Sequence, residues 1–273
     1  MAGATWTPER RNELALRMVS AAFLVPFAIY IVWSGGLVSA LGCGLFAAIL
    51  AYEWVRMTNS PLMTIVVTLA IIPAIVAWLW GTYIALIVLF ACAIIAGFSH
   101  PLISERFKSG FGLFYVAGMP LALFALRVDP HWNGLYAAML LMAIVWVSDT
   151  GAFFTGRTLG GPSLSSISPS KTWSGAIGGV GFSALAGVLI ANTVGGGVLA
   201  WALAGGSISI FAQVGDMFES VMKRQLGVKD ASDLLPGHGG VMDRVDGLGI
   251  AAAIGVIVLL AVPALSPALG LAA

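Results

Sequence analysis

Long apolar runs separated by short polar stretches fill almost the whole chain. Each run is long enough to cross about 30 Å of hydrocarbon as a helix. We therefore predict an all-α, polytopic membrane protein with about nine transmembrane helices. The expected spans lie near residues 16–34, 37–56, 62–80, 82–98, 111–127, 132–155, 173–193, 197–222 and 247–267.

The least distinct boundary between spans lies at Gly81, where one long hydrophobic stretch has to be divided in two. No small-residue cleavage site follows the first run, so we interpret it as a retained span rather than a signal peptide. The chain has no evident internal repeat, and residues 1–273 are expected to form a single integral membrane domain. Its N-terminal spans cover about 16–127, and its catalytic spans and loops cover about 132–267.

The composition supports this class of protein. Hydrophobic residues make up 59% of the chain and charged residues only 9%, because a charge in the middle of a bilayer costs about 2.5–3.5 kcal/mol. The net charge of +1 gives no indication of nucleic-acid binding. Cys43 and Cys92 both lie inside apolar runs, so neither a disulfide framework nor a thiolate metal site is indicated.

The basic residues predict the orientation. With the N-terminus in the cytoplasm, nine spans place every Lys and Arg except Arg127 at cytoplasmic ends or loops. This bias follows the positive-inside rule. We therefore predict a cytoplasmic N-terminus and an active-site cleft on the cytoplasmic side. The compact size favours a bacterial inner membrane.

Small residues recur at a four-residue spacing in the seventh predicted span, at Gly175, Gly179, Ser183 and Gly187. A stripe of this kind lets another helix approach closely. Packing within one protomer is the favoured interpretation, and a homodimer interface is left open as the alternative.

Polar side chains concentrate in three segments, all on the predicted cytoplasmic side: 146–157, 166–172 and 215–246. Asp149 lies about two turns inside the membrane boundary, where an acid is expected to be functional. In the third segment, Asp216, Glu219, Ser220 and Lys223 share one helical face.

Asp243 and Asp246 share a face if the start of the last span is helical. Clustered carboxylates favour Mg²⁺, which also binds substrate phosphates, and Lys and Arg side chains suit phosphate oxygens. The alternative is structural: Asp216 and Glu219 can pair with Lys223 or Arg224, and His238 can be a hydrogen-bonding loop residue.

The pattern S-x-x-K-R-x4-K-D-x-S-x-x-L-P-x-H-G-G-x-x-D-R-x-D, from Ser220 to Asp246, resembles the signature of the phosphatidate cytidylyltransferases. The upstream segments DTGAFFTGR and SPSKT resemble further motifs of that family in the expected order. The sequence departs from the family in two ways: Ser174 stands where a glutamate is usual, and a lysine is common in the family at the position of Ser170 or Gly161. No metal or base role is therefore assigned to residue 174.

The resemblance implies that CTP and phosphatidic acid react to give CDP-diacylglycerol and pyrophosphate. Mg²⁺ is the expected cofactor, and a second, monovalent cation such as K⁺ is left open. The membrane lipids are the other expected partner, since phosphatidic acid diffuses in the bilayer. The site residues expected on this basis are Lys223, Arg224, Arg244 and Asp149 as catalytic groups, Lys171, Ser220, Lys229, His238, Gly239 and Gly240 as substrate contacts, and Asp216, Asp243, Asp246 and Glu219 as metal ligands.

Two other functions compete with this interpretation. A CTP-dependent polyprenol kinase would transfer the γ-phosphoryl group and release CDP, but the complete H-G-G-x-x-D-R-x-D pattern favours cytidylyl transfer. A cation-coupled secondary transporter would use Asp149 and Asp216 as a relay. It predicts acids near the middle of the bilayer and inverted repeats, whereas these acids lie toward one face.

Overall fold

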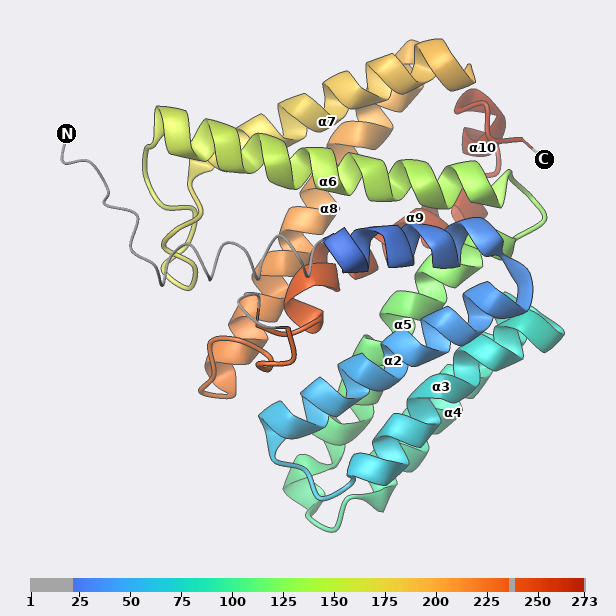
Figure 1. Cartoon of the computed structure of the whole chain (residues 1–273), viewed down its shortest axis with the longest axis vertical. Helices are drawn as coiled ribbons and strands as arrows, with labels where there is room; N and C mark the ends of the chain where they lie inside the picture. Colours follow the sequence, from blue (N-terminus) through green and yellow to red (C-terminus); the bar gives the residue numbers. More distant parts are fainter. Residues whose placement is uncertain (1–21, 236–238, 273) are drawn as a thin grey trace.

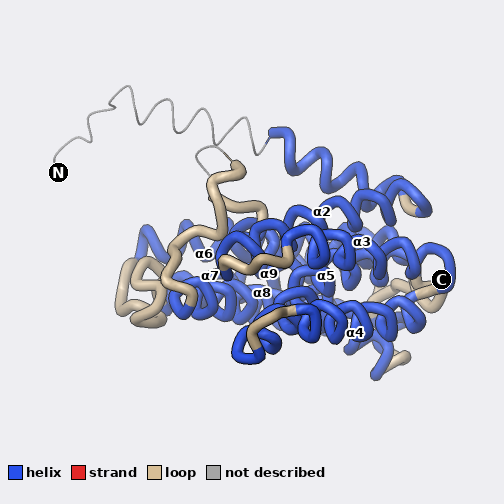
Figure 2. The backbone as a smooth tube through the Cα atoms, turned by 90° about the horizontal axis from the view of Figure 1, so that it is seen from below, coloured by secondary structure: helices blue, strands red, loops and turns tan. Residues whose placement is uncertain are grey.

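The computed structural model describes residues 22–235 and 239–272, and within them the chain is helical, as predicted. Figure 2 shows helices joined by loops, and no strand occurs in these two ranges. The elements in chain order are a helix at Ala22–Ser34, α2 (Gly36–Thr58), α3 (Met63–Trp80), α4 (Thr82–Ser99), η1 (Ile103–Glu105), α5 (Arg106–Val128), α6 (Gly134–Leu159), α7 (Trp173–Val194), α8 (Val198–Gln225), α9 (Met242–Ala261) and α10 (Leu265–Ala268).

Eight of these helices, α2 to α9, are long and apolar enough to cross a membrane, which makes the protein an integral membrane protein with multiple spans. The helix Ala22–Ser34 is the described part of the first predicted span, whose beginning lies outside the described residues. The predicted division at Gly81 is confirmed. Gly81 alone joins α3 to α4, and its φ of 87° explains why glycine stands there.

The last span lies earlier in the chain than the sequence indicates. The predicted range is 247–267, whereas α9 runs from Met242 to Ala261. Its end is explained by Pro263, which disfavours the helical conformation at the residue before it. Its beginning depends on acceptors supplied by other parts of the chain, which are described with the site below. Asp243 and Asp246 consequently lie within the first turns of a helix, and the condition for their sharing a face is met.

The helices form two groups. Figure 1 shows α2 to α5 on one side of the molecule and α6 to α8 on the other. Between them, α9 packs against α5, α6 and α8. One apolar core fills the space among α2 to α5, and a second one lies among α6, α8 and α9. The last span is therefore the element that joins the two groups.

The small-residue stripe of α7 is buried within the chain. A Cβ at Gly179 would lie 3.0 Å from the carbonyl oxygen of Ser148 in α6, and one at Gly187 would lie 2.1 Å from that of Trp201 in α8. The hydroxyl of Ser183 donates to the carbonyl of Ile144 at 3.3 Å. The stripe thus packs α7 against α6 and α8, as the favoured interpretation expects, and it offers no surface to a second copy.

Candidate active site

A polar cleft of about 700 Å³ opens among the end of α6, the beginning of α7, the end of α8 and the beginning of α9. Four aspartates and three basic residues line it together with apolar side chains. These residues are Asp149, Asp216, Asp243, Asp246, Arg157, Lys171 and Arg244. All three polar segments of the sequence therefore contribute to one site.

Lys171 reaches the cleft because local hydrogen bonds fix the start of α7. Thr172 caps this helix by accepting a hydrogen bond from the backbone N–H of Gly175 at 3.1 Å. The hydroxyl of Ser174 lies 3.0 Å from that of Thr172 and donates to the carbonyl of Gly160. Lys171 itself forms an ion pair with Asp216 of α8. The serine that departs from the family pattern thus secures the loop that carries Lys171.

One face of α8 carries Asp216, Glu219 and Lys223, as the helical spacing predicts. Glu219 is fully buried, and Lys223 Nζ lies 3.2 Å from its Oε1 atom. Lys223 also forms an ion pair with Asp243 of α9. A largely buried ammonium group between two carboxylates, on a side chain that is 12% exposed, therefore connects α8 to α9.

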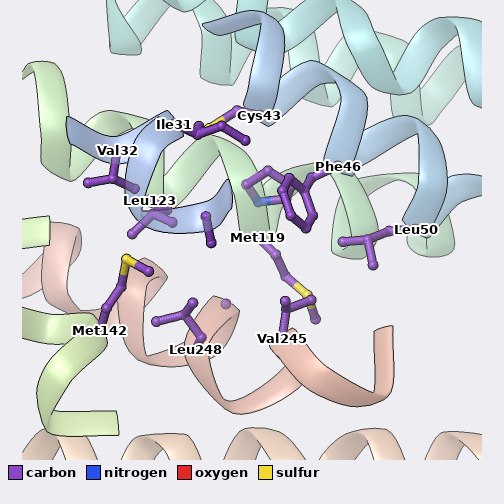
Figure 3. Close-up of a pocket in the computed structure, with 13 residues that line it drawn as sticks. Ile31, Val32, Cys43, Phe46, Leu50, Met119, Leu123, Met142, Val245 and Leu248 are labelled. Carbon is purple, nitrogen blue, oxygen red and sulfur yellow. The ribbon is translucent and has the colours of Figure 1, made fainter. Parts of the chain in front are cut away.

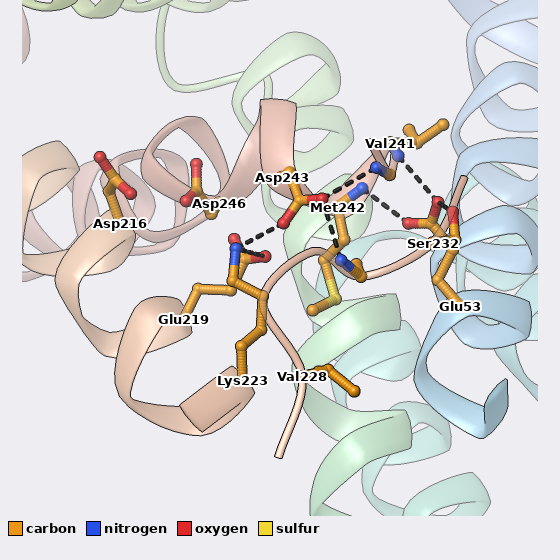
Figure 4. A network of polar contacts seen from close by, with 12 residues as sticks. Glu53, Asp216, Glu219, Lys223, Val228, Ser232, Val241, Met242, Asp243 and Asp246 are labelled. Carbon is orange, nitrogen blue, oxygen red and sulfur yellow. Dashed lines mark hydrogen bonds and ion pairs between the residues drawn. The ribbon is translucent and has the colours of Figure 1, made fainter. Parts of the chain in front are cut away.

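Asp243 organises the segment that precedes α9 (Figure 4). Its Oδ2 atom accepts hydrogen bonds from the backbone N–H groups of Ala231 at 3.0 Å and Gly240 at 2.8 Å. Its Oδ1 atom accepts from Lys223. Both oxygens of Asp243 are thus engaged. The neighbouring Asp246 is 9% exposed, and its Oδ1 atom accepts a hydrogen bond from the N–H of Gly247 at 2.7 Å.

The acidic side chains of this site are chemically suited to bind a hard divalent cation. Carboxylate oxygens are the ligands that Mg²⁺ prefers, and the fully buried carboxylate of Glu219 is paired with the ammonium group of Lys223, 3.2 Å from its Oε1 atom. In the described ranges, no three Asp, Glu, His or Cys side chains converge closely enough to hold one ion in this conformation. Binding would therefore require side-chain rotation of the acids, for which the exposed position of Asp149 and the half-exposed one of Asp216 leave room.

Several predicted residues lie outside the walls of the cleft. Arg224 is exposed at the end of α8 and donates to the carbonyl of Val228 at 3.2 Å. Lys229 is exposed in the loop between α8 and α9, and Ser220 is partly buried on α8. His238 lies outside the described residues. None of the other three lines the cleft, and neither do Glu219, Lys223, Gly239 and Gly240. The roles predicted for these residues toward substrate or metal therefore stay predictions.

Gly239 and Gly240 lie directly before α9. Gly239 has a φ of 80°, which favours glycine. Its carbonyl accepts a hydrogen bond from the N–H of Leu235 at 2.9 Å. Gly240 is enclosed: a Cβ there would lie 2.8 Å from Ala231 Cβ. This pair of glycines allows the backbone to turn tightly beside the acids.

Glu53 of α2 is a site-related residue that the sequence analysis missed. It is fully buried and accepts hydrogen bonds from the backbone N–H groups of Val241 at 2.8 Å and Met242 at 2.7 Å (Figure 4). Its Oε1 atom also accepts from the hydroxyl of Ser232 at 2.6 Å. These are the acceptors that allow α9 to begin at Met242. An acid inside a predicted span is an available signal, and it applies to Glu53 as it does to Asp149.

A small apolar cavity of about 60 Å³ lies beside the same segment of α9 (Figure 3). Side chains of the helix Ala22–Ser34, α2, α5 and α6 enclose it, and Val245, Leu248 and Gly249 form its α9 wall. Leu248 also lines the polar cleft. The beginning of α9 therefore separates a polar chamber from an apolar one.

Comparison with known proteins places these residues in a family. The cytidylyltransferase family matches residues 15–262. The phosphatidate cytidylyltransferase of Brucella suis is 38% identical over 259 residues, which cover 89% of this chain and 92% of that protein. The enzyme of the same name from Pseudomonas aeruginosa is 32% identical over 258 residues, covering 86% of this chain and 93% of its own. The matched range contains every residue of the cleft.

Proposed function

The chain belongs to the cytidylyltransferase family and has the activity of its phosphatidate cytidylyltransferase relatives, and from this premise we propose how the cleft performs the reaction. CTP and phosphatidic acid give CDP-diacylglycerol and pyrophosphate. A phosphate oxygen of the lipid attacks the α-phosphorus of CTP in line, a new P–O bond forms, and the bond to the departing pyrophosphate breaks. The lipid phosphate is already anionic, so the reaction needs no strong general base.

The observation that carries the proposal is the convergence of four aspartates and three basic side chains in one cleft. Two polyanionic substrates repel each other, and charge builds up on the leaving pyrophosphate. Catalysis of such a transfer depends on positioning and on electrostatic stabilisation. We assign the neutralisation of phosphates to Lys171 and Arg244 in the cleft wall and to Lys223, which is paired with Asp243. Arg224 and Lys229, which are exposed, are secondary candidates.

Members of this family generally use a divalent metal, and we propose Mg²⁺. We assign Asp216, Asp246 and Glu219 as its ligands and give Asp243 a supporting position, because Asp243 already accepts hydrogen bonds at both oxygens. Asp149 lines the same cleft as Asp216 and Lys171. A bound Mg²⁺ ion would supply charge neutralisation at the phosphates. The acids and bases of the cleft would orient the two substrates. Their ion pairs hold the ammonium groups of Lys171 and Lys223 beside the acids, close to where the phosphates are expected to bind.

The position of the cleft suits one substrate from the bilayer and one from the cytosol. We propose that the N-terminus and the cleft face the cytoplasm, where CTP is available. The distribution of basic residues supports this orientation. A membrane-impermeant maleimide should then label a Lys229→Cys variant from the cytoplasmic side, and not from the outside of intact cells. Labelling from the outside would reverse the orientation.

The reaction itself is tested with purified protein in detergent, phosphatidic acid, Mg²⁺ and CTP labelled at the α-phosphate. Label should pass into the lipid fraction while pyrophosphate is released. EDTA should stop both, and added Mg²⁺ should restore them. Label that stays in water-soluble CDP and requires a polyprenol would instead indicate the kinase. Turnover that persists at full rate in EDTA would contradict the metal assignment.

A further inference from the structure

Glu53 is a buried acid that the proposed mechanism does not use. It belongs to α2, in the N-terminal group of helices, and its side chain is fully buried. It does not line the cleft. A carboxylate buried among apolar helices is costly unless hydrogen bonds compensate it. The hydrogen bonds that Glu53 makes therefore indicate what the acid is retained for.

Glu53 and Asp243 hold the same two segments of chain from opposite sides. In the loop between α8 and α9, Glu53 binds the hydroxyl of Ser232 and Asp243 binds the N–H of Ala231. Before α9, Glu53 binds the N–H groups of Val241 and Met242, and Asp243 binds that of Gly240. We call this pair of acids, Glu53 and Asp243, the carboxylate clamp.

Gly240 lies between the two acids of the clamp. A Cβ added there would lie 2.9 Å from Glu53 Oε1 and 3.1 Å from Asp243 Oδ2. The fit is too close for a side chain, so the position of Glu53 determines where the backbone passes. Because α9 begins at the next residues, the same position sets the start of the helix that carries Asp246.

We propose that Glu53 is a positioning residue for cytidylyl transfer, which fixes the Gly239–Gly240 turn and the first turn of α9 against α8. The proposal rests on the proposed function and deepens it. An anion is favoured at a helix N-terminus, where unpaired N–H groups point outward, and charge-assisted hydrogen bonds are the stronger kind. A glutamine at this position would turn an NH₂ group toward backbone donors and lose part of the clamp.

The test is Glu53→Gln, with Ser109→Ala as the matched control. Ser109 is buried in the same group of helices and donates to the carbonyl of Ala96 at 3.1 Å, far from α9 in the chain. Removal of a group that supports metal ligands typically costs about 10- to 100-fold in activity. We expect such a loss in kcat/KM for CTP from Glu53→Gln, with the KM for phosphatidic acid unchanged. Ser109→Ala should keep both KM values of the wild type.

Hydrogen–deuterium exchange supplies a second result that does not depend on the reaction. Glu53→Gln should speed amide exchange in peptides covering 239–247 and leave peptides of α4 unchanged. Ser232→Ala, which keeps the acid and removes one donor, should shift exchange and kcat/KM in the same direction by less. If Glu53→Gln does not fold, the Ser232→Ala variant tests the positioning role of Glu53 in its place.

The outcomes separate the two proposals. If the wild-type protein transfers no CMP to phosphatidic acid, the proposed function fails, while exchange at 239–247 still decides the role of Glu53. Unchanged exchange there, or a loss of folded protein with unchanged KM for CTP and unchanged kcat per folded molecule, would overturn the positioning role. In that case Glu53 would be structural only.

Discussion

The N-terminal helices, residues 22–128, and the C-terminal helices α6 to α8 pack in different ways. Among the N-terminal helices large side chains fill the interior, and Leu50, Leu89, Leu113 and Phe124 are almost completely buried. Among the C-terminal helices backbones meet: a Cβ at Gly205 of α8 would lie 2.2 Å from the carbonyl oxygen of Ser183 in α7. Large side chains dominate the first region, where α4 and α5 also approach closely at Gly97 and Gly110, whereas close backbone contacts dominate the second.

This difference matches what each region contributes. Glycine contacts in a membrane let helices approach closely without relying on hydrophobic burial. Such contacts leave little freedom to adjust, so they hold the walls of the cleft in fixed positions. The faces of α6 and α8 that are not used for these contacts can carry polar side chains, such as Asp149 and Asp216. The N-terminal helices support the C-terminal ones, and most of their side chains do not contact the cleft. Glu53 is the exception, because it binds the segment that precedes α9.

The largest expected effect comes from filling a backbone contact. Gly205→Leu should abolish CMP transfer, because a side chain at this position meets the backbone of α7. Gly181→Leu is the control. Gly181 belongs to α7, the partner helix in this contact, and no atom lies within 4 Å of a Cβ at this position. Size-exclusion chromatography in detergent and label transfer measure both variants. An active Gly205→Leu protein would show that the close contact is dispensable.

The next effect concerns the acids themselves. Asp246→Asn should lower kcat about 100- to 1,000-fold and leave the fold intact, because asparagine keeps the oxygen that accepts from the N–H of Gly247 at 2.7 Å. Asp233→Asn makes the same change of charge at an exposed loop position and should retain wild-type turnover. Steady-state label transfer at several Mg²⁺ concentrations measures both. Retention of more than a third of the wild-type kcat by Asp246→Asn would remove this acid from the metal site.

A smaller loss is expected at Lys171. Its ammonium group pairs with Asp216 in the cleft, and we expect Lys171→Ala to raise the KM for CTP about tenfold, which corresponds to about 1.4 kcal/mol. Lys108→Ala removes an exposed ion pair with Glu105 in the N-terminal region, which typically contributes little. Initial rates over a range of CTP concentrations give both constants. Equal KM values in the two variants would leave Lys171 as a structural partner of Asp216.

The smallest effect on turnover is expected from the N-terminal core. Leu89→Ala removes a side chain of α4 that is 1% exposed and should reduce the free energy of unfolding by about 2–5 kcal/mol. The kcat per folded molecule and both KM values should stay at their wild-type levels. Denaturation in mixed micelles and activity below the transition separate the two quantities. A raised KM would show that packing in this region is coupled to the cleft after all.

The sequence predicts the spans well because each one must be apolar over a fixed length. It also predicts which acids share a helix face, as with Asp216 and Glu219, because that depends only on local spacing. It does not predict that Lys171 pairs with Asp216 or that Asp243 binds backbone N–H groups, since both depend on how distant segments meet. The start of α9 is the sharpest example. Glu53 accepts hydrogen bonds from the N–H groups at the start of α9. Every residue except proline carries a backbone N–H, so the sequence does not indicate which of these groups Glu53 binds.

The partnership of Glu53 with α9 also has a consequence for biosynthesis. Glu53 and the N–H of Val241 are 188 residues apart in the chain. At about 5–20 residues per second, ribosomes need roughly 10–40 s to cover that distance. During this interval the newly inserted α2 carries an acid without its donors, close to the helix end where Arg56 lies. Insertion of α9 therefore supplies the hydrogen-bond donors that Glu53 of α2 lacks until then, and it also forms the last wall of the cleft.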